Sequence, residues 1–375
     1  MPSHRLAMTV GLLAAAPLVL TACGDSGQKA GPADATDVTI QITDDGCAPD
    51  PASAAAGPIT FTVKNVDSGR VTEAEVMKDG KIIGEKENLT PGLSGTFTLR
   101  LDAGDYTVMC PNAKTDRSPF TVTGRAAAGA ADAGLTDAVR AYQDYLSEQS
   151  ASLTAATTTF ATAVRTGDLE KARSLYARTR TYYERIEPVA ETFGDLDPMI
   201  DARVNDVADT AEWTGFHRIE KALWQDGDLA GMGTYADKLL TDVTDLERRI
   251  GTLQLAPEQI ANGAVGLMDE VAKSKITGEE DRYSHTDLWD FAANVAGARE
   301  IVDVLSPTLR ERDTALLTRI DSQLADVMAS LASYQTKDGY QDYSAVTDAS
   351  RRTMTQQVNA LAESLSRVAP IVAGA

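Results

Sequence analysis

Residues 37–123 alternate apolar and polar side chains with a period of two. The alternation is clearest at Val38–Ile42, Ile59–Val63, Thr96–Leu99 and Tyr106–Met109. β-branched and aromatic residues with this period are typical of half-buried strands. Asp79-Gly80, Pro91-Gly92 and Ala103-Gly104 supply turns between them. The pattern predicts an all-β sandwich of short strands.

From Leu135 onward the apolar positions follow a period of 3.6, which predicts helices. Gly, Pro and Asp residues divide this part of the chain, and the short links favour antiparallel packing in a bundle. The predicted helices span residues 135–166, 168–187, 209–225, 232–250, 257–277, 286–305, 308–336 and 346–368. Pro307 is expected to end one of them. The chain is therefore multidomain, with an all-β domain at 37–123, a linker at 124–134 and an all-α helical bundle at 135–375.

The amino-terminal residues form a separate segment. Arg5 precedes a nearly continuous apolar run from Leu6 to Leu20, which is short for a membrane span and fits a signal-peptide core. The sequence Leu20-Thr21-Ala22-Cys23 resembles a bacterial lipoprotein signal. We therefore expect a signal peptide at 1–22, lipidation of Cys23 and a flexible tether at 23–36, which would anchor the exported protein to the outer face of the cytoplasmic membrane. The alternative is a plain secretory signal with an incidental Cys23.

Charge and composition exclude several classes of protein. The formal net charge of −20 argues against nucleic acid as a partner, because a nucleic-acid binder needs a basic face. The 375 residues contain three cysteines without a Cys-x-x-Cys pair, which excludes a zinc ribbon. They contain three histidines, and because His4 lies in the segment expected to be removed, a site with three imidazoles is excluded as well. The sequence also lacks His-Glu-x-x-His and Gly-x-Ser-x-Gly motifs.

Two cysteines lie in the β domain. Cys110 ends a Gly-x-Tyr-x-x-x-Cys-Pro segment that resembles the penultimate strand of cupredoxins, and Cys47 follows the first strand. A blue-copper site also needs two histidines, and residues 24–216 contain none. Cys47 and Cys110 are then either a structural disulfide, favoured by an oxidising exterior, or metal ligands with nearby groups. Those groups are Glu73, Glu75, Met77 and Met109.

The helical part holds acidic side chains on apolar stripes. Glu220 lies at the centre of an arc formed by Trp213, Phe216, His217, Leu223 and Trp224, where an unpaired carboxylate is costly. His217 and Glu220 are three residues apart, so both can reach one point. They form either a metal site or a buried hydrogen bond.

Further carboxylates can join this pair if their helices face it. Glu184 and Glu187 are also three residues apart, and Asp201 follows. Hard oxygen donors with one imidazole suit iron, manganese or zinc. Most of Gly278–Phe291 is expected to cap the next helix, with Asp287 and His285 as weaker ligand candidates.

Three blocks of sequence then resemble the EfeO family of iron-uptake lipoproteins, which join a cupredoxin-like domain to an imelysin-like domain. The blocks are Tyr183–Pro188, Gly215–Leu223 and Glu279–Phe291, and the resemblance extends across nearly all of 37–370. It implies an exported iron-binding protein, not a protease. The metal ligands carried over are Glu184, Glu187, Asp201, His217 and Glu220, with Asp287 less certain, and Cys47, Glu73 and Cys110 in the β domain.

The resemblance also implies cofactors and partners. The helical domain would bind iron as Fe2+ or Fe3+, with zinc as an alternative, and the cupredoxin-like domain would bind copper or iron. The partners would be an iron permease of the EfeU type and a haem peroxidase of the EfeB type. Two other functions remain open: a metal-dependent oxidase or protease, and a metal-dependent binding protein for an acidic polysaccharide.

Overall fold

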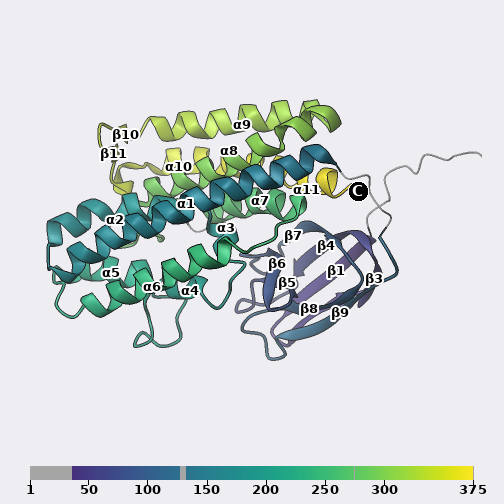
Figure 1. Ribbon diagram of the computed structural model, residues 1–375, viewed down its shortest axis with the longest axis horizontal. Coiled ribbons are helices and arrows are strands. Elements are labelled where there is room, and N and C mark those ends of the chain that lie inside the picture. Colours follow the sequence, from purple (N-terminus) through teal and green to yellow (C-terminus); the bar gives the residue numbers. More distant parts are fainter. Residues whose placement is uncertain (1–35, 127–131, 274, 375) are drawn as a thin grey trace, which may run out of the picture. The chain divides into compact units, whose positions relative to one another are not determined.

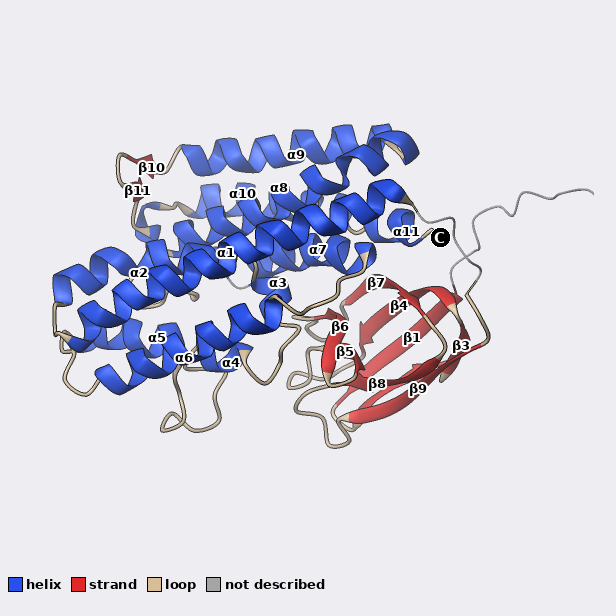
Figure 2. Ribbon diagram, viewed as in Figure 1, coloured by secondary structure: helices blue, strands red, loops and turns tan. Residues whose placement is uncertain are grey.

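The computed structural model describes residues 36–126, 132–273 and 275–374. Strands form its amino-terminal part and helices its carboxyl-terminal part (Figures 1 and 2). The β domain contains β1 (Thr36–Thr43), β2 (Gly46–Asp50), β3 (Ser53–Ala55), β4 (Gly57–Asn65), β5 (Ala74–Lys78), β6 (Lys81–Lys86), β7 (Ser94–Leu101), β8 (Gly104–Met109) and β9 (Arg117–Thr123).

These strands form two sheets, in the orders β2-β1-β4-β7 and β3-β9-β8-β5-β6. β1 runs antiparallel to β2 and parallel to β4, and Ile40 pairs with Val63. The alternation predicted for the first strand is confirmed, because Val38, Ile40 and Ile42 are all buried. The sandwich predicted for residues 37–123 is therefore present.

Aromatic rings fill the space between the sheets. Phe61 stacks on Phe97 and meets Phe120 edge to face, with ring centroids 5.1 and 5.5 Å apart. Cys47 on β2 and Cys110, directly after β8, form a disulfide with a Cα–Cα distance of 6.1 Å. This bond joins a strand of one sheet to the end of a strand of the other.

The sequence pattern did not reveal β5 and β6. β5 has three consecutive buried residues, Ala74, Glu75 and Val76, and β6 has one buried residue, Ile82. Neither strand alternates, because Glu75 on the other face of β5 is buried as well as Ala74 and Val76, and β6 forms the sheet edge beside the helical domain. Both strands carry or border the acidic side chains considered below.

The helical domain packs its helices around one large apolar core. The helices are α1 (Ala133–Arg165), α2 (Leu169–Glu184), α3 (Glu187–Ala190), α4 (Asp197–Asp201), α5 (Gly215–Lys221), α6 (Gly233–Ile250), α7 (Pro257–Lys273), α8 (Asp287–Arg312), α9 (Thr314–Ala332), α10 (Asp348–Leu365) and α11 (Val368–Ala373). A small hairpin, β10 (Gln335–Thr336) with β11 (Gly339–Tyr340), lies between α9 and α10.

Two predicted helix boundaries were wrong. α8 continues through Pro307, and the break comes instead at Asp313, whose side chain caps α9 by accepting from the Leu316 amide. Pro307 costs the helix one backbone donor, while buried Leu305 and Leu309 hold the helix on either side of it. Residues 209–214 are not helical, because Gly215 at the start of α5 has a φ of +85°.

The first half of the helical domain presents charged groups to its interior. On α2 the apolar residues Ala172, Tyr176 and Tyr183 are fully buried, and Arg180 and Glu184 are equally buried among them. The β domain contacts α7, where Lys86 pairs with Asp269. None of the described helices is long and apolar enough to cross a membrane.

Candidate metal centre

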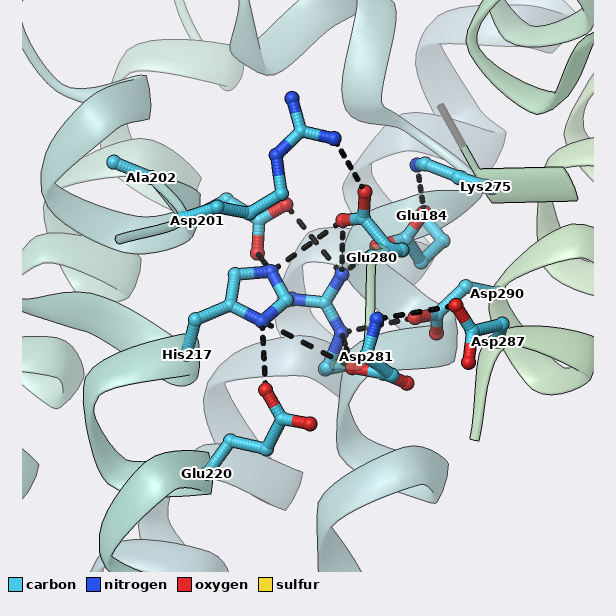
Figure 3. Close-up of polar contacts among 12 residues, drawn as sticks. Glu184, Asp201, Ala202, His217, Glu220, Lys275, Glu280, Asp281, Asp287 and Asp290 are labelled. Carbon is cyan, nitrogen blue, oxygen red and sulfur yellow. Dashed lines mark hydrogen bonds and ion pairs between the residues drawn. The ribbon is translucent and has the colours of Figure 1, made fainter. Parts of the chain in front are cut away.

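Five segments bring charged side chains to one buried point of the helical domain (Figure 3). α2 and the start of α3 supply Glu184 and Glu187, the end of α4 supplies Asp201, and α5 supplies His217 and Glu220. The remaining side chains come from the loop before α8 and from its first turn: Glu280, Asp281, Asp287 and Asp290. The segments lie far apart in sequence, so only folding creates this centre.

Gly215 explains why α5 begins where it does. Its φ of +85° lies in the left-handed region, and a Cβ there would overlap the carbonyl group of Ile200 in α4. The missing side chain lets α5 approach the end of α4 closely, which brings His217 to Asp201. A π-helical turn at Ala222–Asp226 follows α5 directly, as is frequent at functional sites.

His217 lies between two groups of carboxylates. Its Nδ1 is 3.1 Å from Glu220 Oε2 and 3.3 Å from the Tyr176 hydroxyl. Its Nε2 is fully buried and forms no hydrogen bond within the described residues. That atom lies 3.4 Å from Glu280 Oε1 and 3.6 Å from Asp201 Oδ1. The imidazole is therefore presented to carboxylate oxygens on both of its edges.

Backbone amides fix the second carboxylate of α5. Glu220 Oε1 accepts from the amides of Tyr283 at 2.9 Å and Ser284 at 2.7 Å. These bonds tie the loop before α8 to α5 and hold the other oxygen, Oε2, toward His217. Glu220 is thus oriented before any ion arrives.

Three sets of ligand atoms come close enough to share an ion. They are Asp201 with His217 and Glu280, His217 with Glu220 and Asp281, and Glu184 with Glu187 and Asp201, with the atoms of each set within 4.8 Å of one another. Carboxylate oxygens with one imidazole nitrogen suit iron, manganese or zinc. The buried, unbonded His217 Nε2 fits the same class of ion.

Internal cations neutralise much of this negative charge. The fully buried Arg180 guanidinium pairs with Glu184, Asp201, Glu280, Asp281 and Asp290. Lys275 Nζ contacts Glu184 at 2.5 Å and Glu187 at 2.7 Å. Burial opposes both charges, yet the surrounding carboxylates raise the pKa values of Arg180 and Lys275 well above their usual range. Both cations therefore stay charged.

The carboxylates also hold a proton on the imidazole. Burial and Arg180 lower the pKa of His217, but Asp201, Glu220 and Glu280 outweigh them and raise it to about 10. Burial raises the pKa values of Asp287 and Asp290 well above the ordinary value for aspartate. A metal ion entering this centre must therefore displace protons.

The residues proposed from sequence are mostly brought together. Glu184, Glu187, Asp201, His217 and Glu220 all belong to the three ligand sets. Asp287 lies beside these ligand sets, but none of the sets found among the described residues includes it. Its Oδ1 accepts a hydrogen bond from the Asp281 amide at 3.3 Å, and its buried Oδ2 makes no hydrogen bond within the described residues. His285 is exposed.

Sequence reasoning missed Glu280, Asp281 and the internal cations. Glu280 and Asp281 were assigned to helix capping, although an acidic pair just before a helix was a usable signal. Arg180 also had a signal, since it lies on the apolar stripe of α2 four residues from both Tyr176 and Glu184. Lys275 had none.

The second predicted site, Cys47 with Glu73 and Cys110, is not formed in this structure. The two sulfurs are bonded to each other and offer no thiolate. Glu73 is instead grouped with Glu85 and Glu87. The disulfide forms because adjacent strand ends bring the two cysteines within bonding reach. Lipidation of Cys23 lies outside the described residues.

Comparison with known proteins gives the same two-part division. Residues 138–368 match the imelysin family model and residues 12–122 match the model of the cupredoxin-like domain. The chain is 43% identical over 358 residues to the iron uptake system component EfeO of Escherichia coli O1:K1, covering 94% of this chain and 95% of the relative. It is 42% identical over the same length to the proteins of that name from Escherichia coli K12 and Shigella flexneri.

The chain belongs to the EfeO family. The resemblance drawn from three short blocks is therefore confirmed across the chain, and so is the fold class of a cupredoxin-like domain followed by an imelysin-like helical domain. The family is one of iron uptake components, which supports a role in iron uptake and metal binding and points to a role other than catalysis.

Proposed function

We propose that this protein is an exported lipoprotein that captures iron in its helical domain and delivers it to a membrane iron permease. One observation carries the proposal: the buried His217 Nε2 makes no hydrogen bond within the described residues and lies between Asp201 and Glu280. A buried nitrogen without a hydrogen bond in the midst of carboxylates is suited to an ion.

The ligands proposed are Asp201, His217 and Glu220, joined by Glu184 and Glu187 and by the newly found Glu280 and Asp281. Asp287 supports the loop that carries Asp281. The ion proposed is iron, with zinc as an alternative because this donor set accepts both.

The delivery steps rest on family membership. Iron released from the centre would pass to an EfeU-type permease, and an EfeB-type haem peroxidase would act with it. Lipidation of Cys23 would keep the protein at the outer face of the cytoplasmic membrane. The proposed role involves binding and transfer, without turnover of a substrate.

The test is iron binding by the full mature chain and by a His217→Ala/Glu220→Ala variant. Anaerobic titration with Fe2+ should show tight binding to the wild type and a loss of at least a hundredfold in affinity for the variant. The matched control is His285→Asn, which changes an exposed histidine and tolerates its positive φ of 57°. Equal affinity of the double variant and the wild type would refute the proposed centre.

A further inference from the structure

The candidate metal centre has one side that reaches solvent. The side chains of Asp201 and Glu187 are 10% and 9% exposed, whereas those of the other proposed ligands are at most 3% exposed. Asp201, Glu187 and Glu280 line one pocket together with Asn205 and Asp206, which are exposed residues of the loop between α4 and α5. An ion therefore reaches the centre most directly from the side of this loop.

Arg203 lies at this entrance, two residues after the end of α4. Its Nη1 donates to Glu280 Oε2 at 3.0 Å, and its Nε donates to Asp206 Oδ2 at 2.9 Å. The side chain of Arg203 is 30% exposed and that of Asp206 is 43% exposed. Arg203 therefore links a buried candidate ligand of the centre to a carboxylate at the surface.

The pair with Arg203 occupies one oxygen of Glu280 and leaves the other toward the centre. Glu280 Oε1 lies 3.4 Å from His217 Nε2 and 3.1 Å from Arg180. Arg180 and Lys275 also pair with carboxylates of the centre, but both side chains are completely buried. Neither of them can turn into solvent without disrupting the core, whereas the partly exposed guanidinium of Arg203 can.

The loop that carries Arg203 is held together at its base. The indole nitrogen of Trp213 donates to the carbonyl oxygen of Ala202 at 2.6 Å, and Trp213 is 2% exposed. Asp206 Oδ2 also accepts from the backbone amide of Arg203 at 3.0 Å. Because the loop is fixed at these points, Arg203 can leave Glu280 by rotation of its side chain alone. Exposed side chains rotate within picoseconds to nanoseconds.

We propose that Arg203 is a gate that sets how fast ions enter and leave the centre, a role that rests on the function proposed above. While Arg203 is paired with Glu280, its guanidinium covers the entrance and places a positive charge where the ion has to pass. When the side chain turns toward solvent, the entrance opens. Because the gate acts in both directions, the fraction of time that it is open multiplies the association rate and the release rate alike, and the dissociation constant changes little.

The experiment measures the release of Fe2+ from the full mature chain into an excess of a chromogenic Fe2+ chelator, by anaerobic stopped-flow absorbance. Equilibrium dialysis gives the dissociation constant, and the release phase of interest is the one that His217→Ala lacks. Arg203→Met removes the charge and keeps a long side chain, and Arg203→Lys keeps the charge. The matched control is Arg249→Met, because the 26% exposed Arg249 also bridges two carboxylates, Asp195 and Asp245, which belong to none of the ligand sets.

We expect Arg203→Met to release Fe2+ about tenfold faster than the wild type with a dissociation constant within about threefold, because charge-assisted hydrogen bonds keep the gate closed for most of the time. The retained affinity would also show that the variant is folded. Arg203→Lys and Arg249→Met should both release Fe2+ at a rate within about threefold of the wild type.

Three results for Arg203→Met would overturn the gate. Unchanged release would show that Arg203 does not limit exchange. Slower release with tighter binding would show that it acts only as a repelling charge, and faster release with equally weakened binding would show that it only positions Glu280. In each of these cases the proposed function stands, provided that His217→Ala lacks the release phase. A phase that persists in His217→Ala would refute the proposed function, and the gate with it.

Discussion

At the scale of the residue, Arg180 organises the candidate centre. One guanidinium contacts carboxylates from α2, α4, the loop before α8 and α8 itself. It occupies the region where an ion would bind, so it replaces part of the ion's charge when no ion is present. Arg180 thereby keeps a metal-free centre folded.

Replacing Arg180 by Met should destabilise the metal-free protein by about 3–5 kcal/mol, because it leaves buried carboxylates without their counter-charge. Urea denaturation with and without metal measures this, and added Mn2+ should recover part of the loss. Arg299→Met, which breaks exposed pairs with Asp303 and Asp321, should change stability by at most about 1 kcal/mol. A similar effect of both substitutions would contradict the role given to Arg180.

The imidazole of His217 gives a pH dependence with a definite sign. Its pKa is raised to about 10 in the folded protein, from about 6.5 in an unfolded chain. Its contribution to stability is complete below pH 6.5 and is lost as the pH rises to about 10.

We therefore expect the metal-free protein to lose stability between pH 6.5 and 10, by up to about 1.4 kcal/mol per pH unit for this one proton. His217→Gln lacks the proton and should show a shallower decline, as measured by urea denaturation at a series of pH values. Parallel profiles for the two proteins would show that His217 is neutral in the folded state.

At the scale of the element, short helices position several of the candidate ligands, and what decides those positions is where the helices begin and end. α4 and α5 have only five and seven residues. They meet where Gly215 touches the backbone of Ile200. α5 packs against long helices, because Phe216 contacts Phe160 of α1 and Tyr176 of α2.

Gly215→Ala should destabilise the protein by about 3 kcal/mol or more, because it adds a backbone overlap to the strain of a positive φ. It should also weaken metal binding by moving α5 away from Asp201. Gly227→Ala is the matched control, since Gly227 also has a positive φ of 66° but its Cβ would meet nothing within 4 Å. The control should cost about 1–2 kcal/mol and leave metal affinity unchanged in calorimetric titration.

At the scale of the whole molecule, negative charge dominates. The net charge of −20 creates a field that attracts cations. The carboxylates of the candidate centre come from segments between α2 and the first turn of α8. Charge therefore concentrates metal ions near the protein before any ligand binds them.

The association rate of Mn2+ should accordingly fall about tenfold when ionic strength rises from about 10 mM to about 0.5 M, because salt screens the field. Stopped-flow mixing measures the rate, and the dissociation rate of bound Mn2+ from the buried centre should change little. Association that is insensitive to salt would show that entry to the centre, and not electrostatic attraction, limits the rate.

The sequence by itself determined the order of the two domains and most of the candidate ligands. Period-two and period-3.6 patterns report burial on one face of a strand or helix, so they revealed β1, β4, β7 and β8 and most helices. His217 and Glu220 were found because residues three apart on one helix lie on the same face. Glu184 and Glu187 were found from the same spacing, although they lie at the end of α2 and the start of α3. Strands β5 and β6 were missed because burial on both faces, or at an edge, leaves no alternation.

Only the tertiary structure decided which charges meet. Glu280, Asp281 and Lys275 lie about 60 to 100 residues from the groups they contact in α2 and α5, and no local pattern encodes such a distance. The same holds for the disulfide between Cys47 and Cys110. Because the two cysteines are bonded to each other, Glu73 is grouped with Glu85 and Glu87 instead. Side-chain type and periodicity are properties of a segment, whereas charge compensation depends on which segments the fold brings into contact.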